Sequence, residues 1–336
     1  MKSLKKETLI LRSKFLDTTR SFLKDHGFLE IDTPIYKPVV GMEPYLDPFQ
    51  VASPSRKEKG YLITSPEYSL KQALSTGLDR IYEITHTFRS GEEGSPIHSP
   101  EFLMLELYAR SWDDIKLRHF CKQYFQHLGH MFQTSQMETL ARSLPIFADL
   151  QTEPYYREWK VEDLFLQHTG RGFQKRELVQ TITQHSLTNS PLVDLDSWPY
   201  EDLFFLVFLN KIEPNLDLGI VFLYDYPEEC AALSRVIEGR AKRFEIYWNR
   251  IELANAFWEL RDPKEQRKRF VAEQRLREQL GKEVFPLDGD FLQVLDSGDF
   301  PDCSGISFGL DRIFMLLLGE SSLHTLSPYA QSELGA

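Results

Sequence analysis

Residues 85–102 combine charged and aromatic side chains in a pattern that could bind a nucleotide. The sequence THTFRSGEEGSPIHSPEF reads as a strand, a polar loop and the start of a second strand. Arg89, at the end of the first strand, could hold a phosphate in its planar guanidinium fork. Phe102, at the start of the second, could stack on a base. Taken alone, the segment could also be a solvated hairpin loop.

Three glutamates follow one another at intervals of seven, at positions 245, 252 and 259. The pattern around them predicts a tight hairpin that turns near Asn249, so that Glu245 and Glu252 face each other across it. Two facing carboxylates repel unless a cation lies between them. Mg²⁺ held by both carboxylates and by phosphate oxygens would remove that repulsion. The alternative is that both glutamates point to solvent, which is the commoner position of a strand glutamate.

A third candidate is GISFGLDR at residues 305–312, which predicts a strand, a glycine and then an apolar helix. Gly305 and Gly309 would leave one face of the strand bare, so that a flat ligand could approach the backbone. Arg312, one turn into the helix, could reach a phosphate. In the alternative interpretation Asp311 only stabilises the helix N-terminus and Arg312 is paired at the surface.

The surrounding pattern predicts elements that would position these residues. An amphipathic helix is expected over residues 8–27, with Gly27 ending it, and strands over 79–90 and 101–110. Residues 111–240 are expected to be mostly helical and contain no recognisable motif. Antiparallel strands with helices outside them indicate an α+β fold.

Composition and missing motifs exclude several classes of protein. The 336 residues include 50 acidic and 39 basic side chains, a net charge of −11, which argues against gripping nucleic acid through a basic surface. The three cysteines have no metal-ligand spacing and indicate a reducing compartment. No signal peptide is present, and the longest apolar run, residues 203–209, is far shorter than the roughly 20 residues of a membrane span, so a cytoplasmic protein is expected. P-loop and dinucleotide-binding motifs are absent.

Together the three clusters resemble motifs 1, 2 and 3 of the class II aminoacyl-tRNA synthetases. The helix and strand before Pro34 resemble motif 1, FRSGEEGSPIHSPEF resembles motif 2 and GISFGLDR resembles motif 3. The segments TSPEYSLKQAL, EFLMLELY and RFEIYWNRIELANAFWEL are similar to those of the lysyl branch. The resemblance covers residues 8–318, with 111–240 only loosely matched. It implies an antiparallel sheet flanked by helices.

The resemblance is strongest to the free-standing members of the lysyl branch, the elongation factor P–(R)-β-lysine ligases. The motif 1 helix begins at about residue 8, which leaves no room for an anticodon-binding domain, so a single catalytic domain over residues 1–336 is expected. The family's activity would be ATP-dependent activation of (R)-β-lysine, or lysine, to an aminoacyl-adenylate and transfer to a lysine side chain of elongation factor P. A homodimer that uses ATP and Mg²⁺, with no tRNA and no membrane partner, is expected.

The resemblance also implies roles for individual residues. Arg89 and Arg312 would be the catalytic residues, on the α-phosphate and the γ-phosphate. Mg²⁺ would be held by Glu245 and Glu252. ATP would contact Arg89, Glu92, His98, Ser99, Phe102, Glu252, Leu253, Gly309 and Arg312. The amino acid would contact Ser65, Pro66, Glu67, Tyr108, Asn255, Glu259 and Ser307.

This chain departs from the family pattern at three positions. Ser90 and Gly91 separate Arg89 from Glu92 where the family usually has Arg-x-Glu, so the loop is one residue longer. Ser99 stands where the family generally has asparagine. Ser307 replaces a glycine that is typical of lysyl-tRNA synthetases, and a larger side chain there favours a β-amino acid substrate.

Three other functions are compatible with the same motifs. The chain could be a truncated lysyl-tRNA synthetase that acts on lysine and an RNA acceptor, or an ammonia-dependent asparagine synthetase. It could also be a non-catalytic, amino-acid-sensing dimer. The presence of all four charged residues that a silent paralogue tends to lose argues against the last: Arg89, Glu245, Glu252 and Arg312.

Overall fold

The computed structural model describes residues 6–53, 59–91, 94–134, 149–152, 155–188 and 194–326. The chain forms two compact units, the first of residues 1–151 and 261–336 and the second of residues 152–260. Glu92, one of the predicted nucleotide contacts, lies outside the described residues. The single catalytic domain expected over the whole chain stays a prediction.

The first unit contains a sheet of long, mostly antiparallel strands. β1 pairs with β5 in parallel, whereas β5–β6 and β6–β12 are antiparallel. A small second sheet has the order β2-β4-β3 and is antiparallel. The strands of this unit are β1 (Leu29–Glu30), β2 (Tyr36–Lys37), β3 (Gln50–Ala52), β4 (Lys59–Leu62), β5 (Arg80–Phe88), β6 (Glu101–Arg110) and β12 (Cys303–Gly309).

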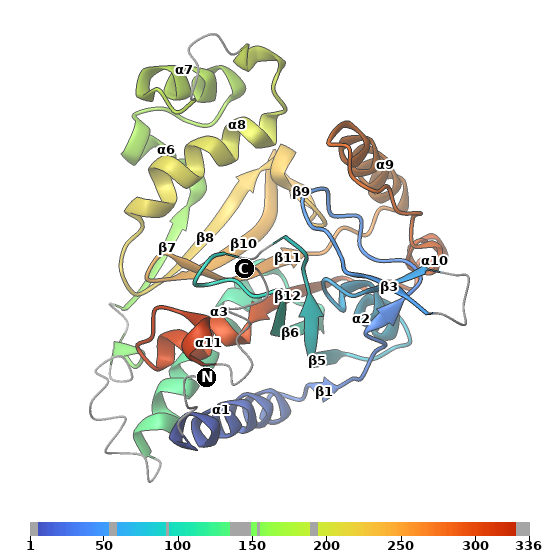
Figure 1. The fold of residues 1–336 in the computed structure, drawn as a ribbon, viewed down its shortest axis with the longest axis vertical. Helices are drawn as coiled ribbons and strands as arrows, with labels where there is room; N and C mark the ends of the chain where they lie inside the picture. The colour runs from blue at the N-terminus through green and yellow to red at the C-terminus, as the bar shows by residue number, and fades with distance from the viewer. Residues whose placement is uncertain are drawn as a thin grey trace. The chain divides into compact units, whose positions relative to one another are not determined.

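Helices pack against this sheet (Figure 1). Phe308 of β12 packs on Tyr124 of α3, and Phe15 of α1 stacks on Phe314 of α11. Side chains alternate along a strand, so neighbouring Ser307 faces the opposite side. The helices of this unit are α1 (Lys6–Asp25), α2 (Glu67–Leu74), α3 (Asp114–Thr134), α9 (Pro263–Gln279), α10 (Gly289–Ser297), α11 (Leu310–Leu317) and the short 3₁₀ turn Leu323–Thr325.

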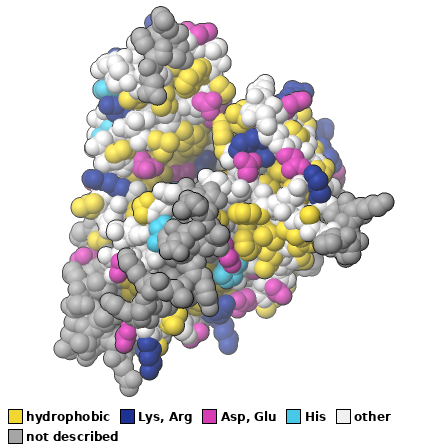
Figure 2. Space-filling model, in the orientation of Figure 1, with side chains coloured by type: hydrophobic (Ala, Val, Ile, Leu, Met, Phe, Trp, Pro, Cys, Tyr) yellow, Lys and Arg dark blue, Asp and Glu magenta, His cyan; other side chains and the backbone are white. Residues whose placement is uncertain are grey.

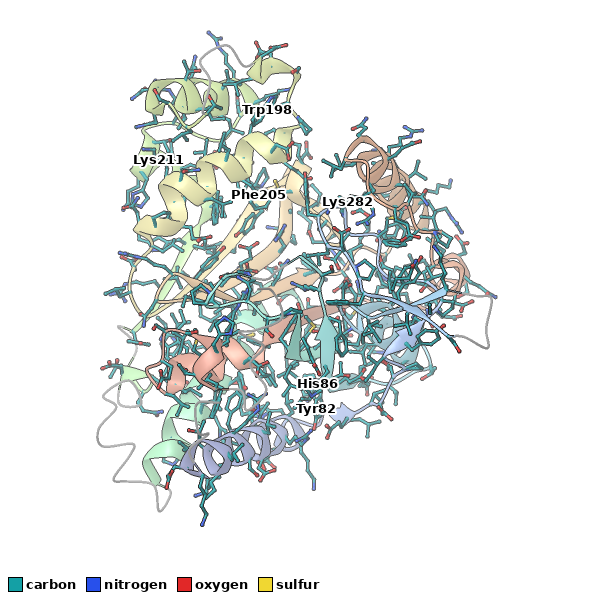
Figure 3. The ribbon with its side chains drawn as sticks, in the orientation of Figure 1. Tyr82, His86, Trp198, Phe205, Lys211 and Lys282 are labelled. Carbon is teal, nitrogen blue, oxygen red and sulfur yellow. The ribbon has the colours of Figure 1, made fainter. Side chains whose placement is uncertain are left out.

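The strands of the second unit follow the order β11-β10-β8-β7, with β9 beside β10. Only β7 and β8 are parallel. Its strands are β7 (Tyr156–Lys160), β8 (Ile220–Pro227), β9 (Val236–Ile237), β10 (Arg240–Trp248) and β11 (Ile251–Trp258). Its helices are α6 (Val161–Thr169), α7 (Lys175–His185), α8 (Tyr200–Val207), the π-helical turn Phe208–Ile212 and the 3₁₀ turns Leu195–Ser197, Glu213–Asn215 and Glu228–Cys230. Trp198, Phe205 and Lys211 lie around α8 (Figure 3).

Most elements predicted around the motifs are confirmed. The first helix ends before Gly27, whose φ of 77° is the left-handed conformation that favours glycine at a helix end. The two strands that flank motif 2 are β5 and β6. The hairpin turns at Asn249 and Arg250, both with positive φ, which is the two-residue turn that matches the twist of antiparallel strands.

The expectation that residues 111–240 are mostly helical is wrong in part, because β7, β8 and β9 lie there. β8 is buried along most of its length, so its apolar residues do not alternate with polar ones. Such a run cannot be distinguished from a buried helix by periodicity. The apolar run at 203–209 lies in α8 and the following π-helical turn and packs in the core of the second unit. Among the described residues, no helix combines the length and the apolar character needed to cross a membrane.

Candidate active site

One face of β6 carries residues predicted to contact the amino acid and a residue predicted to contact ATP. Tyr108, Glu106 and Phe102 lie an even number of residues apart, and therefore on the same face of the strand. On the neighbouring β12, Gly305 is opposite Tyr108 and Ser307 is opposite Glu106. The strands therefore bring the predicted residues Tyr108, Ser307 and Phe102 to one surface, spread over a length of about 20 Å.

The centre of this surface is Glu106, which the sequence analysis missed. Its side chain is buried at 2% exposure and accepts hydrogen bonds from the hydroxyls of Ser65 and Tyr108, both at 2.6 Å. Burial and then the nearby charge of Glu67 raise the pKa of Glu106 to about 8. Continuing the strand alternation from Tyr108 would have identified it, since an acid on the same face two residues away is unusual in a buried strand.

Glu67 is held at the first turn of α2 by two contacts. Its carboxylate accepts a hydrogen bond of 2.6 Å from Lys71, and its backbone N–H donates to the Ser65 hydroxyl at 3.0 Å. Lys71 is itself buried, with its ammonium 5.7 Å from the centre of the Tyr108 ring. Pro66 stands at the N-cap of the helix. Ser65, Pro66, Glu67 and Tyr108, all predicted substrate contacts, thus lie in one network of residues.

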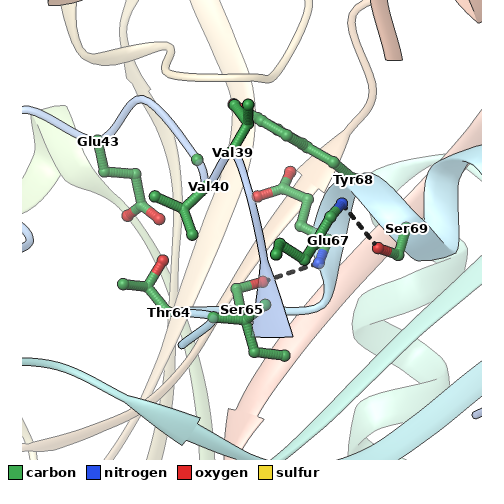
Figure 4. Close-up of a pocket in the computed structure, with 11 residues that line it drawn as sticks. Val39, Val40, Glu43, Thr64, Ser65, Glu67, Tyr68 and Ser69 are labelled. Carbon is green, nitrogen blue, oxygen red and sulfur yellow. Dashed lines mark hydrogen bonds between the residues drawn. The ribbon is translucent and has the colours of Figure 1, made fainter. Parts of the chain in front are cut away.

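A small pocket opens beside this network (Figure 4). Glu67 and Ser65 line it on one side and Glu43 lines it on another. The other labelled residues of the wall are Val39, Val40, Thr64, Tyr68 and Ser69. Two carboxylates, Glu43 and Glu67, and one cation, Lys37, line this small space, so its net charge is negative and it suits a cationic group better than an anionic one.

The expectation that Gly305 leaves room for a flat ligand is wrong. A β-carbon at this position would overlap the ring of Tyr108, which lies across the glycine from the neighbouring strand. The glycine therefore accommodates a side chain of the protein and keeps the Tyr108 hydroxyl within reach of Glu106.

Replacing Gly305 by alanine is expected to displace Tyr108 and to lower the stability by about 1–3 kcal/mol, the usual cost of overpacking a core. Thermal unfolding would measure the loss. Gly289→Ala is the matched control, because a β-carbon there meets nothing within 4 Å. Equal unfolding midpoints for the two variants would contradict the assignment of Gly305 to Tyr108.

The nucleotide end of the surface contains Arg89 and Phe102. Arg89 follows β5 directly, and its guanidinium carbon lies 5.1 Å from the centre of the Phe102 ring. Its backbone N–H donates to Pro100 at 2.9 Å, which ties the two ends of the loop together. His98 lies in the same loop with a ring nitrogen 2.8 Å from the Ser95 hydroxyl, and Ser99 follows it. The predicted pair Arg89 and Phe102 therefore lies together.

The motif 3 residues are attached to the same loop. Gly309 is the N-cap of α11 and is paired with Met104 of β6. The Nε of Arg312 donates to the carbonyl of Ile97 at 3.1 Å.

Asp311 lies in the first turn of α11 and makes further contacts beyond the helix N-terminus. It accepts a hydrogen bond from the backbone of Leu103 at 2.8 Å and forms an ion pair with Arg12 of α1 at 2.6 Å. It therefore fixes the start of α11 against both β6 and α1.

In the second unit the three spaced glutamates lie on or beside the β10–β11 hairpin. Glu245 and Glu252 do not face each other directly: Glu245 is opposite Asn255, and Glu252 is opposite Tyr247. Leu253 is the extra residue of a bulge in β11, and this bulge is what brings Glu252 to the face of Asn255. The two carboxylates are diagonal neighbours, a relation that spans about 7–8 Å between backbones.

Glu245 is buried, so a solvent-facing position is excluded for it. At 5% exposure, it accepts hydrogen bonds from Arg243 at 2.5 Å, from Tyr226 at 2.5 Å and from Tyr247 at 2.9 Å. Burial and then the charge of Glu245 raise the pKa of both tyrosines well above its usual range. Arg243 also donates to the side-chain oxygen of Asn255 at 3.2 Å.

Glu259, the third of the spaced acids, is buried just after β11. It pairs with Ser234 through an isolated bridge, and its carbonyl accepts hydrogen bonds from Arg235. Within the described ranges, no group of three or more His, Cys, Asp or Glu side chains is arranged to hold a metal ion. The first unit thus combines two arginines with a carboxylate-lined pocket, whereas the second offers acids and an amide.

Comparisons with known proteins identify one family to which the chain is similar. A family model described as tRNA synthetases class II (D, K and N) matches residues 1–333. The elongation factor P–(R)-β-lysine ligase of Proteus mirabilis is 32% identical over 319 residues, 93% of this chain and 91% of that protein. A homolog of that ligase from Aquifex aeolicus is 32% identical over 312 residues, 92% of this chain and 94% of its own length. The lysine–tRNA ligase of Carboxydothermus hydrogenoformans is 31% identical over 325 residues, 95% of this chain but 64% of that protein.

Proposed function

The chain belongs to the class II tRNA synthetases of the D, K and N group, and on that premise we propose that it activates (R)-β-lysine with ATP and transfers the acyl group to a lysine side chain of elongation factor P. The predicted class II fold, an antiparallel sheet flanked by helices, is confirmed, as is an ATP-dependent ligase. The observation that carries the proposal is the buried Ser65–Glu106–Tyr108 network. It lies on the same face of β6 as Phe102, whose ring contacts Arg89.

The first step needs positioning and positive charge rather than a nucleophile from the protein. The substrate's own carboxylate oxygen attacks the α-phosphorus of ATP, the bond to the β-phosphate oxygen breaks, and pyrophosphate leaves with that electron pair. Arg89 and Arg312 would neutralise the charge that builds on the phosphates. Phe102 would stack on adenine. His98, Ser99 and Gly309 would contact the nucleotide from the loop and from the start of α11.

A lysine-like substrate carries two ammonium groups, so its pocket needs acidic side chains that pair with them. Glu67 and Glu106 would receive these groups in the first unit, together with Tyr108. Asn255 and Glu259, which lie in the second unit, stay predicted contacts of the amino acid. Ser307, directly opposite Glu106, would narrow the pocket and so favour the β-amino acid.

Glu245 and Glu252 are the proposed ligands of Mg²⁺. A carboxylate has about four lone-pair positions. Three of those on Glu245 are taken by Arg243, Tyr226 and Tyr247, which leaves about one for an ion. Glu252 is proposed as the second ligand, and the donor set fits a hard cation that keeps phosphate oxygens as further ligands. When bound, the ion would supply positive charge to the phosphates.

In the second step the neutral amine of a lysine in elongation factor P attacks the carbonyl carbon of the adenylate. A C–N bond forms, the C–O bond to AMP breaks, and the proton of the amine passes to solvent or to the departing phosphate. No general base of the chain is required, because the acyl-adenylate is already activated.

Binding of the diamine is expected to release about one proton near pH 7. In the free protein the pKa of Glu106, at about 8, leaves its carboxyl largely protonated, and an ammonium group beside it lowers that pKa. Calorimetric titration in buffers of different ionisation enthalpy measures the proton. The release should fade above about pH 9, where the carboxyl is already ionised, and should disappear in Glu106→Gln. Proton uptake on binding would contradict the assignment.

A homodimer and a cytoplasmic location complete the proposal. Five large apolar side chains are exposed on α1 and on the segment after it, and they are available to an interface: Leu9, Ile10, Leu29, Ile35 and Tyr36. Figure 2 shows hydrophobic side chains gathered between β5 and β3 of the same unit. The cysteines Cys121, Cys230 and Cys303 are free and buried, which suits a reducing compartment.

ATP–pyrophosphate exchange with (R)-β-lysine, L-lysine and L-aspartate as separate substrates tests this function. Exchange that is fastest with (R)-β-lysine is expected. The 31% identity to a lysine–tRNA ligase favours one second candidate, a lysine-activating enzyme with an RNA acceptor. A clear preference for L-lysine together with charging of a tRNA would support that candidate and reject the first.

A further inference from the structure

Arg277, near the end of α9, is a buried arginine that the reaction scheme does not use. Only 1% of the side chain is exposed, and its guanidinium carbon lies 4.6 Å from the centre of the Phe285 ring. Its Nε donates to the carbonyl of Glu283 at 2.7 Å. The remaining hydrogen bonds all go to one distant segment, residues 43–47: from Nη1 to the carbonyls of Glu43 at 2.7 Å, Leu46 at 2.7 Å and Pro44 at 3.3 Å, and from Nη2 to the Asp47 carboxylate at 2.9 Å.

Residues 43–47 touch the candidate active site at two points. At one end, Glu43 lines the small pocket together with Ser65 and Glu67 (Figure 4). At the other end, the carbonyl of Asp47 accepts a hydrogen bond of 2.7 Å from the backbone of Ser90. Ser90 is the residue after Arg89. The segment therefore joins the amino-acid pocket to the start of the loop that carries the phosphate-binding arginine.

Only an arginine can make this set of contacts. Its planar fork presents five N–H donors in fixed directions, whereas lysine offers three donors at a single point. The carbonyls of Glu43 and Leu46 would lose their buried donor if the fork were removed, and an unsatisfied buried carbonyl is costly.

A second cation supports the same segment from outside. Lys282, labelled in Figure 3, donates to the carbonyl of Tyr45 at 3.0 Å and forms an ion pair with Asp47 at 2.9 Å. Burial alone would raise the pKa of Asp47, but hydrogen bonds from Lys282 and Arg277 outweigh burial and lower it below its usual value. The segment is thus held by charge from two sides.

We propose that Arg277 is a positioning residue for adenylate formation, which fixes the distance between the amino-acid pocket at Glu43 and the phosphate-binding Arg89 through the backbone of residues 43–47. The proposal rests on the proposed function for its chemistry, but the geometry it describes exists without any substrate. Since a misplacement of about 1 Å can cost about 10²-fold in rate, loosening this segment affects the reaction without removing any group that touches the substrate.

The test compares Arg277→Lys with Arg267→Lys. Both substitutions lie on α9, but Arg267 is exposed and paired only with Asp296. In Arg277→Lys, the kcat of pyrophosphate exchange is expected to fall about 10²-fold and the KM for the amino acid to rise about tenfold, at a temperature where both variants are folded. In Arg267→Lys, both constants should remain those of the parent protein. A purely structural Arg277 would lower the unfolding midpoint with kcat and KM unchanged below it, which would overturn the proposal.

Two further measurements keep the proposal testable if the first variant folds poorly or if the proposed function fails. Asp47→Ala removes one partner at a side chain that is 44% exposed, so folding should survive, and a fall in kcat of about tenfold is expected. Amide hydrogen exchange of Glu43, of residues 45–47 and of Ser90 needs no substrate. It should accelerate in both Arg277→Lys and Asp47→Ala but not in Arg267→Lys. Unchanged exchange would reject the role of Arg277, whereas accelerated exchange in a chain that activates no amino acid would reject only the proposed function.

Discussion

Replacing Arg89 by glutamine is expected to slow adenylate formation by about 10³-fold or more. Arg89 leaves β5 with its guanidinium over the Phe102 ring and its backbone tied to Pro100, so its position is set before any ligand arrives. A preorganised cation at a phosphoryl-transfer centre contributes about this much, because it neutralises charge that develops only in the transition state. ATP–pyrophosphate exchange at saturating substrate measures the loss as a change in kcat.

Arg110→Gln is the matched control for this prediction. Arg110 stands at the other end of β6, where it is paired with the exposed Asp79. The same substitution there should leave the exchange rate within about twofold of the parent protein, since isolated surface ion pairs contribute little. If Arg89→Gln kept the rate of Arg110→Gln, Arg89 would not be the phosphate ligand.

Replacing Glu252 by glutamine is expected to lower pyrophosphate exchange by about 10²–10³-fold and to raise the Mg²⁺ concentration needed for half-maximal rate. Glu252 lies opposite Tyr247 across the hairpin, on the face that carries Glu245 and Asn255. Glutamine preserves its size, so the fold and the unfolding midpoint should be retained. Exchange measured over a range of Mg²⁺ concentrations gives both numbers.

The choice of Glu252 for this experiment follows from the contacts of its neighbour. Glu245 is unsuitable, because its loss would leave Arg243 buried without its carboxylate and would disturb the hairpin itself. Glu158→Gln serves as the control, since Glu158 is an exposed strand glutamate of the same unit. An unchanged Mg²⁺ requirement in Glu252→Gln would remove Glu252 from the metal site.

The parts of the fold that could be predicted from sequence are those set by local patterns. The strands around motif 2 flank a turn-rich loop, the first helix has a glycine stop, and the hairpin turns at two residues with positive φ. Arg89 and Phe102 could be placed together because they lie at the two ends of one short loop. Local spacing decides such contacts.

The contacts that escaped prediction depend on residues far apart in sequence or on an irregular backbone. Arg277 reaches a segment about 230 positions earlier in the chain, a relation that no local pattern can carry. The bulge at Leu253 changes which face Glu252 occupies, so the seven-residue spacing alone could not give the correct register. β8 went unrecognised because burial on both faces removes its alternation.

The environment of Glu106 shows a second limit of prediction from sequence. Its position on the strand could be read from alternation, but its burial depends on Ser65 from the loop before α2 and on Tyr108 lying across Gly305. The raised pKa of Glu106 then follows from its burial and from the nearby charge of Glu67. Sequence patterns indicate which residues can take part in binding or catalysis, whereas packing decides their protonation state.

The most direct test of the central claim is the intact mass of elongation factor P after incubation with the chain, ATP and (R)-β-lysine. Elongation factor P is expected to gain the mass of one β-lysyl group, AMP and pyrophosphate should appear in equal amounts, and the gain should be lost with Arg89→Gln. Replacing the acceptor lysine of elongation factor P should abolish it as well. The contradicting result is an elongation factor P that stays unmodified although the same preparation catalyses rapid pyrophosphate exchange with (R)-β-lysine. Elongation factor P would then not be the acceptor.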